Sequence, residues 1–186
     1  SLPSIPAAKI AKPVVAVTPV ATIVPAVPTP QVLSKPSALQ YAYQLHIPDI
    51  SVSAPVLGMG LTTDGKMAGP DNFTEVGWYN LGTRPGQVGN AVLGAHVDNG
   101  GRVTGVFKNL KKLSMGDDIY MIDQNGTQLH YKIAQVKVYD YKEQNTREVF
   151  GPTDKIRLVL ITCHGTFLPS EDTYNQRLVL FAELVK

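Results

Sequence analysis

The stretch that decides the fold is residues 157–165, RLVLITCHG, an almost unbroken apolar run that ends in Cys163, His164 and Gly165. A continuous apolar run of this length is typical of a central β-strand that is buried on both faces. Cys163 then lies where the predicted strand leaves the core and enters a loop. A free cysteine is often only a small buried hydrophobic residue, although such a residue would fit better in the middle of the run. At this point Cys163 could be either a packing residue or a nucleophile.

Two other apolar runs place a polar side chain at the same kind of junction. In residues 89–101, GNAVLGAHVDNGG, an apolar run leads into a Gly-rich turn with His96 at the boundary, and Arg177 opens the run RLVLFAEL at 177–184. Each residue alone has an ordinary interpretation, a histidine hydrogen-bonded at a strand end and a solvated arginine. Together with Cys163 they supply a thiol, a base and a permanent cation. The combination favours nucleophilic catalysis by a cysteine.

The chain from residue 41 onward has the pattern of an all-β protein. Short runs rich in Val, Ile, Tyr and Phe are separated by Gly, Asn, Asp and Pro. The sequence DQNG at 123–126 predicts a hairpin turn, because Asn-Gly tolerates the positive φ angles that such turns need. Strands and long helices do not alternate, which argues against a doubly wound fold and favours a closed barrel of about seven or eight strands. We predict a helical turn at 106–113 and strands at 43–47, 51–57, 89–97, 117–123, 127–141, 156–163 and 177–185.

The composition changes near residue 40 and predicts a domain boundary there. Residues 1–40 are dominated by Pro, Ala and Val and contain no aromatic and no acidic residue. Proline lacks an amide donor and biases the preceding residue toward extended geometry, so we expect an extended stalk or linker rather than a helix. We predict a catalytic domain at 41–186. The many Val and Ile residues of the first segment would also allow part of it to lie along the domain surface.

Charge and cysteine content exclude several classes of function. Seventeen Lys and Arg residues are nearly balanced by fifteen acids, which gives a net charge of +2 without a basic block, so we expect no nucleic-acid partner. One cysteine cannot form an intramolecular disulfide or a Cys-rich metal site. Asp117-Asp118 is a weak candidate for a metal ligand and is better explained as a turn, and we expect no metal or cofactor. No apolar run reaches the roughly 18–20 residues of a membrane span.

The stretches quoted above resemble the sortase family. The matching segments are LITC at 160–163, GAHVD at 94–98, and Arg177 at the start of the last strand. The sequence between VGWY at 76–79 and GNAVL at 89–93 resembles the segment before the catalytic histidine in class F sortases. The resemblance covers about residues 42–186. The cysteine strand of the family often begins with Thr, where this chain has Val159. Gly often precedes the catalytic histidine, where this chain has Ala95. These differences affect the assignment to a sortase class and leave the three candidate catalytic residues unchanged.

The resemblance implies a closed eight-stranded β-barrel and a cysteine transpeptidase. Sortases are membrane-tethered enzymes outside mostly Gram-positive cells that cleave a Leu-Pro-any-Thr-Gly sorting motif after Thr. Cys163 would attack the Thr carbonyl to form a thioacyl enzyme, His96 would protonate the departing amine, and Arg177 would stabilise the oxyanion. The partners would be a sorting-signal peptide and the amine of a cell-wall precursor. We expect a monomer that meets the membrane only through an N-terminal anchor outside these 186 residues.

Other residues receive secondary roles. Thr162, Ala95 and Val97, which flank the candidate nucleophile and base, are expected to contact substrate. Asp98 would orient His96 as in a catalytic triad, although a turn-forming aspartate explains it as well. His164 is an alternative base, although neighbours on a strand point to opposite faces.

The loop at 140–154 would help form the pocket for Leu-Pro, and the segment beginning Leu2-Pro3-Ser4 could lie in that groove. Trp78 and Tyr79 are expected to serve packing. Two alternatives to a transpeptidase stay open, namely a cysteine endopeptidase with water as acceptor and a non-catalytic wall-binding barrel.

Overall fold

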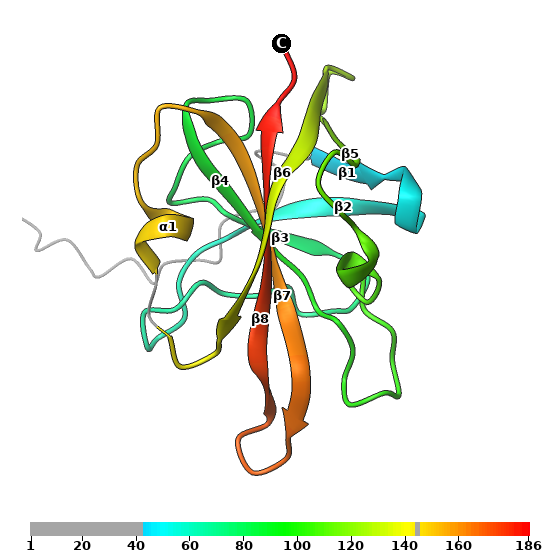
Figure 1. Ribbon diagram of the computed structural model, residues 1–186, viewed down its shortest axis with the longest axis vertical. Helices are drawn as coiled ribbons and strands as arrows, with labels where there is room; N and C mark the ends of the chain where they lie inside the picture. Colours follow the sequence, from blue (N-terminus) through cyan, green and yellow to red (C-terminus); the bar gives the residue numbers. More distant parts are fainter. Residues whose placement is uncertain (1–42, 144–145) are drawn as a thin grey trace, which may run out of the picture. The chain divides into compact units, whose positions relative to one another are not determined.

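The structure is a computed structural model that describes residues 43–143 and 146–186. The prediction of a stalk at residues 1–40, and of Leu2-Pro3-Ser4 in the groove, lies outside these residues. Within the described residues the chain forms eight strands with short helical segments between them (Figure 1). The strands are β1 (Tyr43–Ile47), β2 (Val52–Met59), β3 (Val76–Tyr79), β4 (Gly89–Gly94), β5 (Asp118–Ile122), β6 (Gln128–Asp140), β7 (Ile156–Leu168) and β8 (Thr173–Leu184).

The strands close into a barrel in the order β1-β2-β3-β4-β7-β8-β6-β5, which confirms the predicted all-β barrel. Two neighbouring pairs, β2–β3 and β4–β7, are parallel and the others are antiparallel. The helical segments are the single-turn 3₁₀ helices η1 (Pro48–Ile50) and η2 (Leu110–Lys112) and the short helix α1 (Thr146–Phe150). None of the helices among the described residues is long and apolar enough to cross a membrane.

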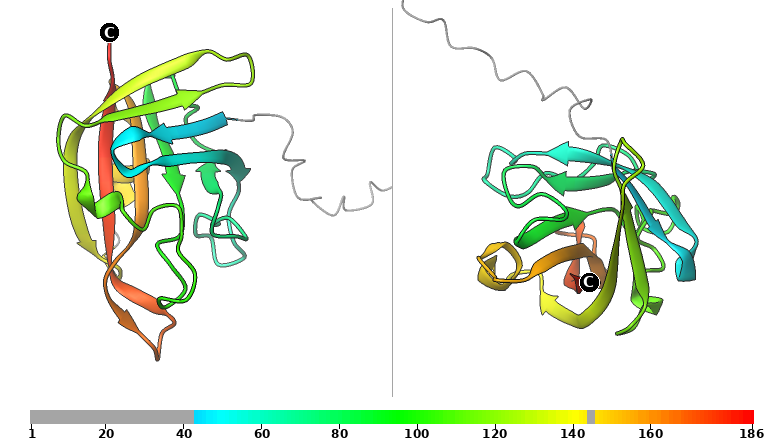
Figure 2. Two further views of the ribbon diagram at one scale, coloured as in Figure 1. Left: turned by 90° about the vertical axis from the view of Figure 1, so that its right-hand side faces the viewer. Right: turned by 90° about the horizontal axis from the view of Figure 1, so that it is seen from above.

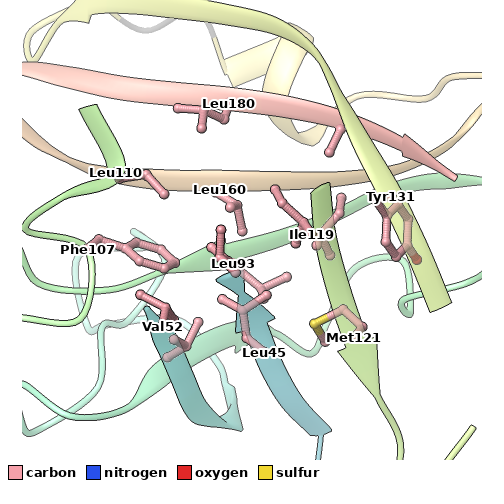
Figure 3. Packing of buried hydrophobic residues seen from close by; sticks show 14 of the residues in the cluster. Leu45, Val52, Leu93, Phe107, Leu110, Ile119, Met121, Tyr131, Leu160 and Leu180 are labelled. Atoms are coloured by element: carbon pink, nitrogen blue, oxygen red, sulfur yellow. The ribbon is translucent and has the colours of Figure 1, made fainter. Parts of the chain in front are cut away.

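The interior of the barrel holds one large apolar cluster (Figure 3). Leu45, Leu93, Leu160 and Leu180 come from four different strands, and Phe107 from the segment before η2 closes one side. All five are at most 1% exposed. Burial of this apolar surface is the main term that stabilises the barrel.

The continuous apolar run at 157–165 is explained by a second cluster on the outer face of β7. Leu158 and Leu160 point into the barrel, whereas Val159 packs outside with Val179 and with Val149 of α1. The run is therefore apolar on both faces from Leu158 to Ile161, because Val149 of α1 packs against the outer face of β7 (Figure 2).

Several predicted element bounds were wrong. The short strand β3 was not predicted, because it has four residues and Gly77 interrupts its pattern. The predicted strand at 89–97 ends at Gly94, while β7 and β8 continue beyond the barrel as a hairpin to Leu168 and from Thr173. This extension carries partly exposed polar residues, so its sequence lacks the apolar run of a core strand. The predicted helical turn at 106–113 is reduced to η2.

We expect Leu160→Ala to lower the free energy of unfolding by about 2–5 kcal/mol, because it removes a fully buried side chain from the centre of the barrel. Urea titration followed by tryptophan fluorescence measures the change. Leu81→Ala is the matched control, because Leu81 is 65% exposed. A loss for Leu160→Ala no larger than that of the control would contradict this view of the core.

Candidate active site

The register of three neighbouring strands brings Cys163, His96 and Arg177 together. In the antiparallel β7–β8 pair, Cys163 lies directly opposite Arg177. In the parallel β4–β7 pair, Gly94 lies opposite Ile161. His96 and Cys163 each follow their member of that pair by two residues, so the two side chains are carried to the same end of the barrel.

Two hydrogen bonds hold the end of β4 against β7. The amide of Ala95 donates to the carbonyl of Ile161 at 3.3 Å, and the Thr162 hydroxyl donates to the carbonyl of Ala95 at 2.8 Å. Thr162 is only 4% exposed, so its hydroxyl is used internally. Thr162 lines the pocket, and its hydroxyl is bonded to the segment that carries His96, so the predicted substrate contact of Thr162, which its backbone would have to make, stays a prediction.

A pocket with a volume of about 410 Å³ opens beside the three residues. The pocket is lined by the loop between β2 and β3, by the end of β4 and the residues after it, by α1 and the end of β6, and by β7 and β8. The lining residues are Lys66, Met67, Ala68, Gly69, Pro70, Gly94, Ala95, His96, Tyr139, Asp140, Tyr141, Glu143, Val149, Phe150, Ile161, Thr162, Cys163, Arg177 and Val179. Val97 and His164 are not among them, so the predicted substrate contact of Val97 and the alternative role of His164 as base gain no support.

His96 is oriented by a backbone carbonyl that sequence reasoning missed. Its Nε2 atom lies 2.9 Å from the carbonyl oxygen of Pro70. A carbonyl can only accept, so Nε2 carries a proton in this contact, and in the neutral ring the lone pair is then on Nδ1. The Phe73 ring packs against the imidazole with 4.7 Å between centroids. No sequence signal connects Pro70 or Phe73 with His96.

The backbone of His96 is also held closely. Its carbonyl accepts a hydrogen bond from the amide of Phe107 at 3.1 Å. Gly105 packs so tightly on the same carbonyl that a Cβ atom at this position would lie 2.1 Å from the oxygen. A side chain at position 105 would therefore displace the backbone that carries the imidazole.

The guanidinium of Arg177 is fixed against its own strand. Nη1 donates to the carbonyls of Tyr174 and Gln176, both at 2.8 Å, and Nη2 donates to the Thr173 hydroxyl at 2.9 Å. The Tyr141 ring centroid lies 5.9 Å from the guanidinium carbon. Three of the five N–H donors of an arginine are used in these bonds, which leaves two for a bound carbonyl or oxyanion.

Burial raises the pKa of the Cys163 thiol above its ordinary value. The positive charge of Arg177 and a backbone hydrogen bond of Tyr174 act in the opposite direction, while the negative charge of Asp98 adds to the rise. Desolvation is the largest of these effects. The free site at neutral pH thus holds a protonated thiol, which needs a base before it can act as a nucleophile.

The hydrogen bonds of the Asp98 carboxylate go to groups other than the His96 imidazole. The carboxylate accepts the Tyr174 hydroxyl, the Gly100 amide at 3.1 Å and the ammonium group of Lys108. Asp98 lies two residues after His96 in the sequence, which is why it was expected to orient the imidazole. The carbonyl of Pro70 is the group that contacts the imidazole.

The wall made by α1 is pinned to the barrel from two sides. The Glu148 carboxylate accepts the Tyr139 hydroxyl at 2.6 Å and pairs with Lys137 of β6. The buried Asn90 of β4 donates to the carbonyls of Glu148 and Gly151 at 3.1 and 3.3 Å. The bond from Lys137 is the largest effect that lowers the pKa of Glu148, and burial together with Glu148 raises that of Tyr139. The prediction that the loop at 140–154 forms part of a pocket agrees with this arrangement.

The acidic pair Asp117-Asp118 is engaged elsewhere. Asp118 pairs with Lys132 at 2.7 Å and with His130 at 2.6 Å. Within residues 43–143 and 146–186, the structure contains no group of three or more His, Cys, Asp or Glu residues that could hold a metal ion.

Trp78 packs in the core at 1% exposure, and its indole donates to the carbonyl of Thr83 at 3.0 Å.

Comparison with known proteins finds a family model described as "Sortase domain", which matches residues 45–185. Similar solved structures include sortase A from Corynebacterium diphtheriae, with a TM-score of 0.61, 23% identity and coverage of 78% of this chain. The chain spans 61% of that structure's length. Sortase C from Clostridium perfringens SM101 has a TM-score of 0.59 and 22% identity, with 81% of this chain and 72% of that chain covered.

A third similar structure is a Clostridium perfringens sortase D5 transpeptidase, with a TM-score of 0.59 and 21% identity over 78% of this chain and 79% of that chain. At these identities the likeness supports the fold. The comparison with curated proteins found no match.

We expect the alkylation of Cys163 by iodoacetamide to rise with pH around a midpoint above the ordinary thiol value of about 8.5. Arg177→Gln removes a charge that favours the thiolate, so it should raise the midpoint further and slow alkylation at pH 8 by roughly threefold or more. Arg102→Gln, at an exposed position, is the matched control. A midpoint well below the ordinary value in the free protein would instead indicate a preformed thiolate–imidazolium pair.

Proposed function

This chain belongs to the sortase family, and we propose that it is a cysteine transpeptidase that cleaves a sorting motif of the Leu-Pro-any-Thr-Gly type after Thr. The observation that carries the proposal is the single pocket shared by Cys163, His96 and Arg177. A thiol, an imidazole with a fixed tautomer and a preorganised guanidinium are the groups that acyl transfer requires. We further propose that the enzyme acts at the outer face of the cell membrane on secreted proteins.

In the proposed first step, Cys163 is acylated by the substrate. Nδ1 of His96 accepts the thiol proton, because Nε2 already donates to Pro70. The Sγ atom adds to the Thr carbonyl carbon, and the resulting oxyanion accepts hydrogen bonds from the two remaining N–H groups of Arg177. The C–N bond then breaks as His96 returns the proton to the leaving Gly amine, which leaves a thioester on Cys163.

The second step consumes the thioester. An incoming amine gives a proton to His96 and attacks the thioester carbonyl, so that a new amide forms and the thiolate leaves. The thiolate takes the proton back from the imidazolium, and the free enzyme is restored. We propose that the amine belongs to a cell-wall precursor, as the resemblance implies.

The apolar part of the pocket suits the Leu-Pro portion of the motif. Its apolar lining comes from Val149 and Phe150 of α1, Met67, Ile161 and Val179. Ligand pockets are lined mainly by apolar side chains, and a few polar groups fix the orientation of the ligand. The class F assignment rests on the sequence at 76–93, because the similar structures named above are sortases A, C and D5.

Mass spectrometry of a Leu-Pro-Xaa-Thr-Gly peptide, with and without a glycine-based amine, tests the proposal. We expect cleavage after Thr, a ligated product that depends on the amine, and no product with Cys163→Ala or His96→Gln. Arg177→Gln should lower the rate by about 10²–10³, as the loss of one oxyanion donor typically does. Arg102→Gln should leave the rate unchanged.

The other outcomes assign the alternatives. Release of the free acid alone, even with the amine present, would mean that water is the acceptor and the protein is an endopeptidase. Absence of cleavage across several motif variants would refute the transpeptidase and favour a non-catalytic wall-binding barrel.

A further inference from the structure

Tyr174 contacts both the strand that carries Arg177 and the loop that carries His96. It lies at the start of β8, and its backbone carbonyl accepts the Arg177 Nη1 hydrogen bond at 2.8 Å. Its hydroxyl donates to Oδ1 of Asp98, which follows His96 by two residues. The Tyr174 ring packs edge to face against Phe167 of β7, with 5.3 Å between centroids. One residue thus joins three segments around the thiol.

The carboxylate of Asp98 organises the loop between β4 and η2. Its side chain is only 5% exposed, and it accepts bonds from Tyr174, Lys108 and the Gly100 amide. Asp98 also forms an isolated β-bridge with Thr104. A carboxylate this deeply buried is costly without partners, so the loop is held in the conformation that keeps them.

We propose that Tyr174 is a positioning residue, whose hydroxyl bond to Asp98 fixes the His96 loop against the β7–β8 hairpin. The inference rests on the proposed function and extends it to a residue outside the three candidate catalytic groups. In the left view of Figure 2 the loop after β4 descends beside the β7–β8 hairpin, which is where this bond is made. Without the bond, the loop after His96 would lose its side-chain tie to the β7–β8 hairpin, and the two bonds of Ala95 to β7 would hold only the start of that segment.

In the bond between Tyr174 and Asp98, the hydroxyl is the donor and the carboxylate the acceptor at neutral pH. Burial raises the pKa of Asp98, but the bonds from Lys108 and Tyr174 outweigh it and hold the pKa below its usual value. The bond to Asp98 is the largest effect that raises the pKa of Tyr174 to about 12. The hydroxyl therefore keeps its proton and donates, and the ionised carboxylate accepts.

Tyr174→Phe removes the hydroxyl and keeps the ring contact with Phe167 and the carbonyl that holds Arg177. We expect kcat for the sorting peptide to fall roughly tenfold while KM changes little, since misplacement of catalytic groups acts on the chemical step. Asp98→Ala removes the acceptor and should lower kcat at least as much, because Lys108 and the Gly100 amide also lose their partner. Adding Tyr174→Phe to Asp98→Ala should cause no further loss, because the bond is already broken. Additive losses, or an unchanged kcat in Tyr174→Phe, would overturn the proposal.

A second readout needs no substrate and so separates this inference from the proposed function. In ¹H–¹³C spectra of the histidine rings, with the His96 signal assigned by His96→Gln, Tyr174→Phe should shift the His96 signal. Tyr120→Phe is the matched control, because the Tyr120 ring stacks on His130 and should shift that signal instead. An unmoved His96 signal refutes the proposal even if no peptide is ever cleaved. Urea midpoints show whether each variant folds. If Tyr174→Phe folds poorly, Asp98→Ala removes the acceptor of the same bond and provides the second variant.

Discussion

The hydrogen-bond register between β4, β7 and β8 is the constraint on which the candidate site depends. Successive side chains of a strand point to opposite faces, so a slip of one residue in β7 would replace Cys163 by His164 in the pocket. The register is held because β7 is buried on both faces, and a slip would place the leucines of the barrel interior in the outer cluster and the outer valine in the interior. Packing far from the thiol thereby determines which side chain meets Arg177.

Burial and charge act against each other at the Cys163 thiol. Removal of Cys163 from water favours the neutral thiol, and the charge of Arg177 only partly offsets this effect. A nucleophile that stays protonated until a base is correctly placed reacts slowly with adventitious electrophiles. The same enclosure that protects the thiol makes the orientation of His96 decisive, and this orientation comes from backbone contacts with Pro70, Phe107 and Gly105.

The sequence predicted the barrel and the three residues that share the pocket, because each stands where an apolar run ends and such ends gather at one edge of a sheet. It did not predict β3, whose four residues are too few for a periodic pattern. It also missed Pro70, Phe73 and Tyr174. Pro70 acts through its backbone, which carries no residue signature, and Tyr174 acts through a partner 76 residues away. The sequence suggested that Asp98 orients His96 because the two are close in sequence, but the hydrogen bonds of Asp98 run to other groups, since local spacing does not report which way a loop turns.

The parallel pairing of β4 with β7 also bears on how the protein folds. The hairpin of β7 and β8 closes over four residues, so Cys163 and Arg177 can meet through a local turn. The bond between Thr162 and Ala95 joins groups 67 residues apart, and such non-local contacts are slow to form because a long loop must close first. We therefore expect Cys163 and Arg177 to come together early in folding and His96 to join them later, so that a partly folded chain pairs the thiol with the guanidinium before the imidazole is in place.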